Sequence, residues 1–146
     1  MTIRSKKGFS LIELLVVISI MAILMALGAV TFSTAQQKGR DAKRRADISA
    51  VQKGFEQYFA ENATYDSNTS CTTMGGDTAF FPAGLPRDPR NSSPYTYSYR
   101  CGSTAYCVCS RIEADGTGNS TAAASSTTCS FARSGSLNYF CISNLQ

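Results

Sequence analysis

The sequence predicts an α+β protein, in which a long N-terminal helix packs on a small antiparallel sheet in a disulfide-rich head. The 146-residue chain has an apolar run from Phe9 to Phe32 and a helical pattern that continues to about residue 60. Gly, Ser, Thr, Asn and Pro then become frequent, and all six cysteines follow. About 85 residues remain after the helical part, which is room for one modest core.

The run from Phe9 to Phe32 is long enough to cross a membrane as a helix. At about 1.5 Å per residue it spans a hydrocarbon core of roughly 30 Å. Apart from Glu13, its interruptions are small, namely Ser10, Ser19, Gly28 and Thr31. An ionised carboxylate inside a bilayer costs about 2.5 to 3.5 kcal/mol, so Glu13 predicts a partner that neutralises it. A signal peptide or a plain anchor with a stray glutamate is the alternative interpretation.

The helical pattern continues beyond the apolar run. Apolar residues recur at steps of three and four toward its end, which predicts an amphipathic half over residues 35–60 that packs on the head. The predicted stripe consists of Ala35, Ala42, Ala46, Ile48, Val51, Phe55, Tyr58 and Phe59. Gly28, Gly39 and Gly54 each cost about 1 kcal/mol relative to alanine, so bending or local melting is expected there.

The formal net charge of +4 is distributed unevenly. Beyond residue 60 the chain is nearly neutral, with five basic against six acidic residues, so the charge does not indicate a nucleic-acid-binding protein. The basic surplus follows the apolar run, at Lys38, Arg40, Lys43, Arg44, Arg45 and Lys53. Such a cluster can face anionic lipid head groups or acidic groups of neighbouring chains. A solvated helix face is the plain alternative.

The six cysteines all lie downstream of the apolar run, at Cys71, Cys101, Cys107, Cys109, Cys129 and Cys141. Their even number in a small head predicts disulfides formed in an oxidising compartment. Fifteen pairings are possible, and the sequence does not choose among them. In an extended strand Cys107 and Cys109 point to the same face, which favours two different partners. Zinc is the competing interpretation, and the lack of His and of Cys-x-x-Cys argues against it.

The rest of the head predicts loops and short strands. Residues 67–94 predict a loop from helix to sheet, with Phe80 and Phe81 as anchors on the core. Strands are predicted at residues 95–99, 105–112 and 137–142. The Ser/Thr-rich segment 116–130 predicts a long surface loop held by Cys129.

The stretch Lys6-Lys7-Gly8-Phe9-Ser10-Leu11-Ile12-Glu13 resembles the class III signal of type IV pilins and type II secretion pseudopilins. The resemblance implies that a prepilin peptidase cuts between Gly8 and Phe9 and methylates the Phe9 amine. It also implies that Glu13 meets the Phe9 amine of an adjacent subunit during assembly. The chain then divides into a leader (1–8), a transmembrane and filament-core helix (9–34), an amphipathic helix half (35–60) and a pilin-like head (61–146).

A second stretch, Leu85 to Tyr97, resembles the Pro-x-Asp-Pro turn and Pro-Tyr-x-Tyr strand entry of pseudopilins and simpler pilins. The family supplies three or four antiparallel strands on the amphipathic half of the helix. Pseudopilins often hold calcium in a late loop, for which the candidate ligands here are Glu113, Asp115 and Asp77. Arg90 replaces the Trp of that pattern and the loop has few acidic residues, so no metal or other cofactor is expected.

The sequence argues against an enzyme, because it offers no His base, no recognisable acidic pair and no phosphate-binding glycine loop. The resemblance implies a structural pilin that is processed by prepilin peptidase and polymerises into a type IV pilus-like filament. A type II secretion pseudopilin and a non-polymerising bitopic anchor that displays a binding head are the alternatives.

The expected partners are further copies of the chain, prepilin peptidase, an inner-membrane assembly platform and membrane lipids, without a specific nucleic acid. We expect a single-pass protein of the cell membrane with its C-terminal head outside, and then a cell-surface or periplasmic filament. The choice between pilus and pseudopilus, between major and minor subunit, and among adhesion, motility, DNA uptake and secretion stays open.

Overall fold

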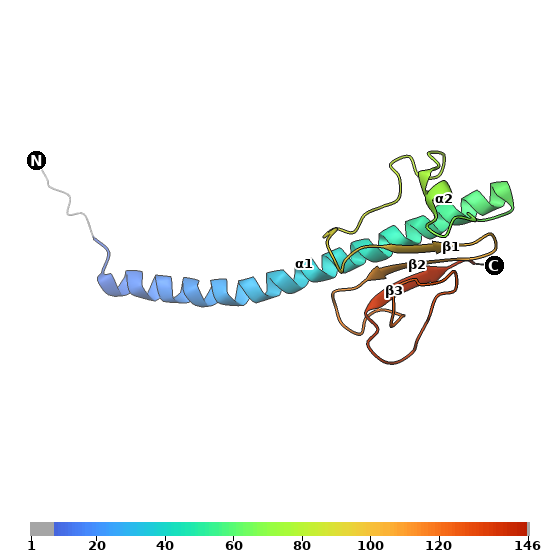
Figure 1. Cartoon of the computed structure of the whole chain (residues 1–146). Helices are drawn as coiled ribbons and strands as arrows, with labels where there is room; N and C mark the ends of the chain where they lie inside the picture. Colours follow the sequence, from blue (N-terminus) through green and yellow to red (C-terminus); the bar gives the residue numbers. More distant parts are fainter. Residues whose placement is uncertain (1–7, 146) are drawn as a thin grey trace, which may run out of the picture. The chain divides into compact units, whose positions relative to one another are not determined.

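The computed structural model describes residues 8–145, apart from the side chain of Val30, and contains two helices and three strands (Figure 1). These are α1 (Leu11–Asn62), α2 (Thr72–Gly76), β1 (Ser98–Cys101), β2 (Tyr106–Arg111) and β3 (Tyr139–Ser143). The predicted α+β class is confirmed, and the predicted long helix is displaced by only two residues at each end. The leader residues 1–7 lie outside the described residues.

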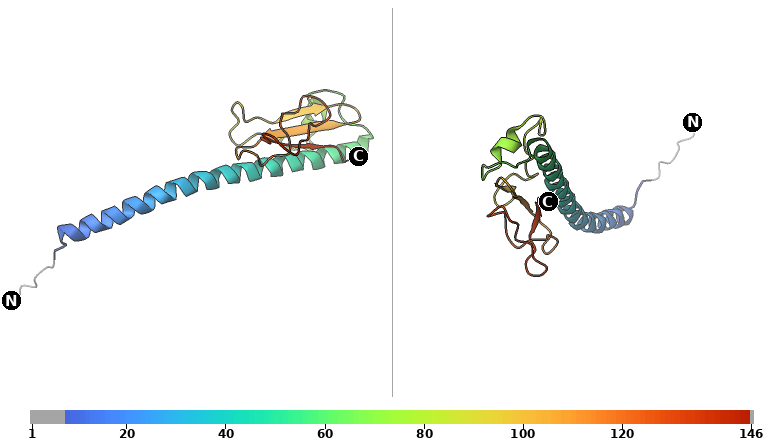
Figure 2. Two further views of the ribbon diagram at one scale, coloured as in Figure 1. Left: turned by 90° about the horizontal axis from the view of Figure 1, so that it is seen from below. Right: turned by 90° about the vertical axis from the view of Figure 1, so that its right-hand side faces the viewer.

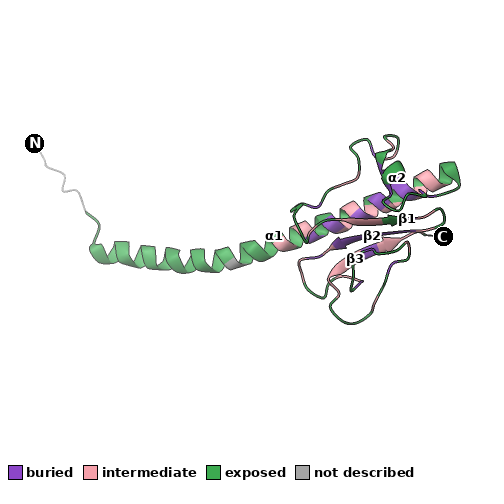
Figure 3. Cartoon of the chain, in the orientation of Figure 1, coloured by how far each residue is buried: buried purple, intermediate pink, exposed green. Residues whose placement is uncertain are grey.

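The chain forms two compact units, Met1–Gln36 and Gln37–Gln146. In the first unit the described side chains of α1 are exposed all round, as the green first half of the helix in Figure 3 shows. Among the described residues, α1 is the one helix whose length and composition would let it cross a membrane. An all-round apolar helix surface is suited to lipid or to other apolar helices.

In the second unit one stripe of α1 is buried, at Asp41, Arg44, Ile48, Val51 and Phe55. The spacing of three and four residues keeps these side chains on one face. The prediction was right for Ile48, Val51 and Phe55, and also for Tyr58 and Phe59, which are partly buried against the same core. It was wrong for Ala35, Ala42 and Ala46, which are exposed. The face of α1 that meets the head passes through positions 41 and 44. Two charged residues, Asp41 and Arg44, are therefore buried there instead of the alanines.

The three strands form an antiparallel sheet in the order β1-β2-β3, which lies along the second half of α1 (Figure 2). The central strand is covered on both faces. Tyr106 and Val108 belong to the core that includes Ile48 and Phe55 of α1. Cys107 and Cys109 alternate to the other face and belong to a second core.

β1 begins later than the predicted strand over residues 95–99. Tyr95 lies in a tight turn, where its N–H donates to the carbonyl of Ser92 at 2.6 Å. Tyr97 instead donates its hydroxyl to Asp47 of α1 at 2.9 Å. Tyr97 therefore fastens the segment before β1 to α1.

The core against α1 is aromatic. Phe55 packs edge-on against Tyr106, with ring centroids 5.1 Å apart, and against Phe81 at 5.6 Å. The predicted anchoring role of Phe80 and Phe81 is confirmed, since both pack in this core. Gly54, a predicted site of bending, has a packing role: a Cβ there would overlap the Phe81 ring. The glycine thus lets the ring approach the helix backbone.

The Ser/Thr-rich loop between β2 and β3 covers the sheet face opposite α1. It is only partly the surface loop that its composition predicts, because Ser120, Ala124 and Cys129 are buried. The Asn119 side chain accepts the N–H of Cys141 at 2.7 Å and donates to its carbonyl at 2.8 Å. These bonds satisfy the outer edge of β3 as a neighbouring strand would.

Candidate functional site

The predicted processing site lies just before α1. Gly8, Phe9 and Ser10 are not helical, and the helix begins at Leu11. Phe9 is 91% exposed, and a Cβ at Gly8 would meet nothing within 4 Å. The Gly8–Phe9 bond therefore lies in accessible, irregular backbone, which is the form of chain that a protease can accommodate.

Glu13 lies in the first turn of α1 and reaches back to the start of the helix. Its Oε2 accepts the N–H of Ser10 at 2.8 Å. The pattern Ser10-x-x-Glu13 is half of a capping box, and a carboxylate in the first turn also suits the positive end of the helix dipole. This second role of Glu13 was missed by sequence reasoning, although the Ser-x-x-Glu spacing is its signal.

Apolar side chains surround Glu13 along the helix. Large hydrophobic residues between Leu11 and Phe32 are exposed by 48% or more. No salt bridge joins Glu13 to a basic side chain within the described residues. The site thus presents one carboxylate, satisfied by its own backbone, within a surface that water solvates poorly.

The six cysteines form three disulfides, Cys71–Cys101, Cys107–Cys129 and Cys109–Cys141. Cys107 and Cys109 have different partners, as their position on one strand face favours. The first disulfide joins the segment before α2 to the end of β1, and the other two fasten the Ser/Thr-rich loop and β3 to β2. Closing loops in this way restricts the unfolded chain, which stabilises a head with a small core.

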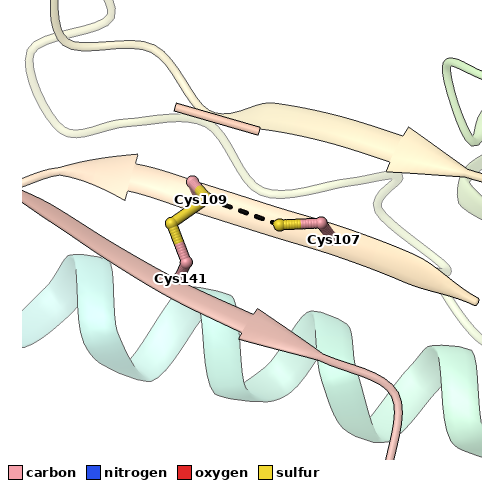
Figure 4. Close-up of side chains that lie close together, drawn as sticks. All are labelled: Cys107, Cys109 and Cys141. Atoms are coloured by element: carbon pink, nitrogen blue, oxygen red, sulfur yellow. Dashed lines mark hydrogen bonds between the residues drawn. A yellow bond between two sulfur atoms is a disulfide. The ribbon is translucent and has the colours of Figure 1, made fainter. Parts of the chain in front are cut away.

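Cys107, Cys109 and Cys141 place their sulfur atoms within 4.8 Å of one another (Figure 4). The Sγ atoms of Cys107 and Cys109 are 3.7 Å apart, although each is bonded to a different cysteine. Metal ligation requires thiolates, and these sulfurs are held in disulfides. The cluster is a contact between two disulfides and does not offer a zinc site.

A buried arginine joins α1 to two loops of the head. Arg44 is completely buried and donates twice to Asp88, from Nε to Oδ2 at 2.6 Å and from Nη2 to Oδ1 at 3.0 Å. Its Nη1 donates to Asp41 at 2.6 Å and lies 2.7 Å from Glu113. Asp88 is the acidic residue of the Pro-x-Asp-Pro turn, so this turn is the partner of a helix charge.

Within this cluster, Arg44 and Glu113 shift each other's pKa. Burial lowers the pKa of Arg44, but hydrogen bonds to Asp88, Glu113 and Asp41 raise it above its ordinary value. Hydrogen bonds from Arg40, opposed by burial and assisted by Arg44, lower the pKa of Glu113 from 4.5 to about 2. Asp41 also accepts the N–H groups of Glu113 and Ala114. The cluster orients the loop after β2.

The interpretation of the basic cluster as a wholly external surface is wrong for three members. Arg40 and Arg44 bind carboxylates of the head, and Arg45 donates to the carbonyl of Thr117. Sequence reasoning missed this because Asp88 lies 44 residues from Arg44 and Glu113 lies 73 residues from Arg40. Lys38 and Lys53 remain exposed.

The three calcium candidates are not gathered into one site. Glu113 is engaged by Arg40 and Arg44, and Asp77 accepts the N–H of Ala79 at 2.9 Å. Within the described residues, the three cysteines above are the one group close enough to share a metal ion. The groups around Glu113 are the cationic guanidinium groups of Arg40 and Arg44, and such surroundings do not fit a calcium ion.

Comparisons with known proteins agree with this arrangement. The model of the prokaryotic N-terminal methylation motif matches residues 3–29. The type IV wide pilus major component of Thermus thermophilus is 34% identical over 106 residues, which is 72% of each chain. The chain belongs to the type IV pilin family.

A second relative, the prepilin peptidase-dependent protein A of Clostridium perfringens, is 37% identical to this pilin over 77 residues. That match covers 51% of the pilin and 55% of the relative. No solved structure matches the pilin. The predicted class III signal is thus confirmed as a family feature. In this pilin the fold consists of a long helix and a head with a three-stranded sheet.

Proposed function

We propose that this pilin is a structural subunit that prepilin peptidase processes and that polymerises into a type IV pilus-like filament. The observation that carries the proposal is Glu13, a carboxylate at the start of a helix whose apolar side chains are exposed on every side. Such a surface needs lipid or other helices to cover it, and the charge needs a cation. Further copies of the processed chain supply both.

Processing would create that cation. Hydrolysis of the Gly8–Phe9 peptide bond leaves a carboxylate on Gly8 and an amine on Phe9. A protonated or methylated amine at the N-terminus of α1 meets the positive end of the helix dipole, which is unfavourable. Glu13 of an adjacent subunit offsets this charge, and the pair gains strength where water is excluded.

The proposed path runs from membrane to filament. The first unit anchors the precursor as a single membrane span, with the head outside, where the disulfides form. The assembly platform in the membrane then transfers subunits from lipid into the filament. A pilus is favoured over a pseudopilus because the relative that covers most of this chain is a pilus component. A structural role leaves no chemical step for the subunit to catalyse.

Intact-mass analysis of membrane-extracted protein tests the first step. We expect loss of Met1 to Gly8 and an added methyl group on Phe9, and retention of the leader in cells that lack prepilin peptidase. Gly8→Ala should be cut poorly, while Gly28→Ala, also a glycine in open space, should be cut normally. A cut beyond Val30, or a mature protein that keeps its leader, would contradict the proposal.

Imaging of cells tests the second step. Deletion of the chromosomal copy should remove surface filaments, and the wild-type copy should restore them. Filaments that persist without this chain would show that it is not their main subunit.

A further inference from the structure

The head contains a polar cavity of about 370 Å³ beside β1. Its lining is formed by Thr69, Ser70, Arg100, Ser125, Ser126 and Thr127, together with Cys101. Five of these side chains carry a hydroxyl and one carries a guanidinium, while none is acidic. We propose that this cavity binds an anionic saccharide, that is, a sugar unit that bears a carboxylate or a phosphate.

The hydrogen-bonding groups of the cavity are largely uncommitted. Ser126 donates to the carbonyl of Thr128 at 2.9 Å. Within the described part of the chain, the hydroxyls of Thr69, Ser70, Ser125 and Thr127 have no internal hydrogen-bond partner. Each hydroxyl can donate and accept, as the hydroxyls of a sugar require.

Arg100 supplies the charge preference. Its Nη1 donates to the carbonyl of Tyr99 at 2.8 Å, which holds the guanidinium at the strand edge. The remaining N–H groups suit a carboxylate or a phosphate, because the planar guanidinium binds two oxygens of such a group side by side. With no acidic residue in the lining, the cavity favours an anion.

The walls of the cavity are held in place by covalent bonds. Cys71–Cys101 joins the segment that contains Thr69 and Ser70 to the end of β1 that contains Arg100. The N–H of Cys101 also donates to the carbonyl of Thr69 at 3.2 Å. Cys107–Cys129 fastens the third wall, since Cys129 follows directly after residues 125–128. Walls that are fixed before binding lose little entropy on binding.

The position of the cavity leaves it accessible in the head. Arg100 pairs with Cys107 in the sheet register, and Cys107 belongs to the core opposite α1. The cavity therefore lies on the sheet face that α1 does not cover, between β1 and the Ser/Thr-rich loop, and most of its lining residues are exposed. Its volume is at the lower end of the range for small-molecule sites, which suits one sugar unit.

Calorimetric titration of the full chain in detergent tests this proposal with glucuronate, glucose phosphate, glucose and inorganic phosphate. We expect the two anionic sugars to bind, and glucose and inorganic phosphate to bind at least about tenfold more weakly. Loss of a charge-assisted hydrogen bond is of that size, so Arg100→Gln should weaken glucuronate binding about tenfold or more. Thr127→Val, which removes one hydroxyl at constant size, should weaken the binding of every sugar tested.

Arg133→Gln is the matched control, because Arg133 is an exposed arginine of the head that lies outside this lining. It should bind like the wild type. Near-ultraviolet circular dichroism should show the same head fold in all variants. Equal affinities of wild type and Arg100→Gln would overturn the proposal, as would equal binding of glucose and glucuronate. Inorganic phosphate that binds as tightly as glucuronate, or no binding of either anionic sugar, would also overturn it.

Discussion

The two halves of α1 place their charged side chains in opposite environments. In the second half, Arg44 is completely buried and its donors meet Asp88, Asp41 and Glu113 of the same chain. In the first half, Glu13 lies among exposed apolar side chains and accepts only an N–H of its own backbone among the described groups. Arg44 is thus neutralised by carboxylates of its own chain, whereas the first half retains a charge for another molecule to neutralise.

Replacement of Glu13 should have the largest effect, on assembly and not on the head. An ammonium left unpaired in a buried filament core costs about 3 to 5 kcal/mol per subunit. Glu13→Ala should therefore give protein that is inserted, cut after Gly8 and disulfide-bonded, but absent from sheared filaments. Quantitative immunoblots of the sheared and cell fractions measure this.

Glu13→Gln separates charge from capping. Glutamine at this position can still accept the Ser10 N–H, so the capping box survives while the charge is lost. We expect Glu13→Gln to fail in assembly as Glu13→Ala does. If the glutamine variant polymerises normally in cells without a wild-type copy, the carboxylate serves only as a helix cap, and the contrast between the two halves disappears.

Removal of the buried arginine should be the most damaging charge change in the head. Arg44→Ala leaves three carboxylates without their shared partner, and breaking a buried pair in this way costs about 3 to 5 kcal/mol. Urea denaturation of the full chain in detergent, followed by near-ultraviolet circular dichroism, should show this loss. Arg133→Ala should stay within about 0.5 kcal/mol of the wild type. Similar midpoints for the two variants would refute the structural role of Arg44.

Acid should weaken the same cluster. The pKa of Glu113 falls from 4.5 to about 2 on folding, so its contribution is complete above pH 4.5 and is lost as the pH falls toward 2. A shift of this size corresponds to about 3 kcal/mol. Thermal unfolding as a function of pH should therefore show a steeper loss of stability for the wild type than for Glu113→Gln. Parallel curves would show that Glu113 does not carry the acid sensitivity.

An exposed ion pair on the same helix should contribute least. Lys43 binds Asp47 at 3.1 Å, but its side chain is 61% exposed. Lys43→Ala should cost at most about 0.5 kcal/mol, and added salt should reduce the difference. A loss as large as that of Arg44→Ala would mean that ion pairing, rather than burial, determines the importance of charges on α1.

Much of the architecture follows from local patterns. The apolar run and the stripe at Ile48, Val51 and Phe55 predict the helix and its packed face, because helical periodicity is a property of neighbouring residues. The loop anchors Phe80 and Phe81 and the separate partners of Cys107 and Cys109 follow from similar reasoning. The Ser10-x-x-Glu13 spacing equally predicts the helix cap that the structure shows.

Local patterns in the sequence are sufficient to predict the long helix, its apolar first half with a single carboxylate, and a head that contains every cysteine. The pairing of the cysteines, the burial of Arg44 and the role of the Pro-x-Asp-Pro turn as its partner appear only in the folded chain. The reason is physical: periodicity is local, whereas Arg44 and Asp88 are 44 residues apart and meet only when sheet and loops close on the helix. A buried arginine and an exposed one look alike in sequence, because burial is decided by distant partners that satisfy its donors.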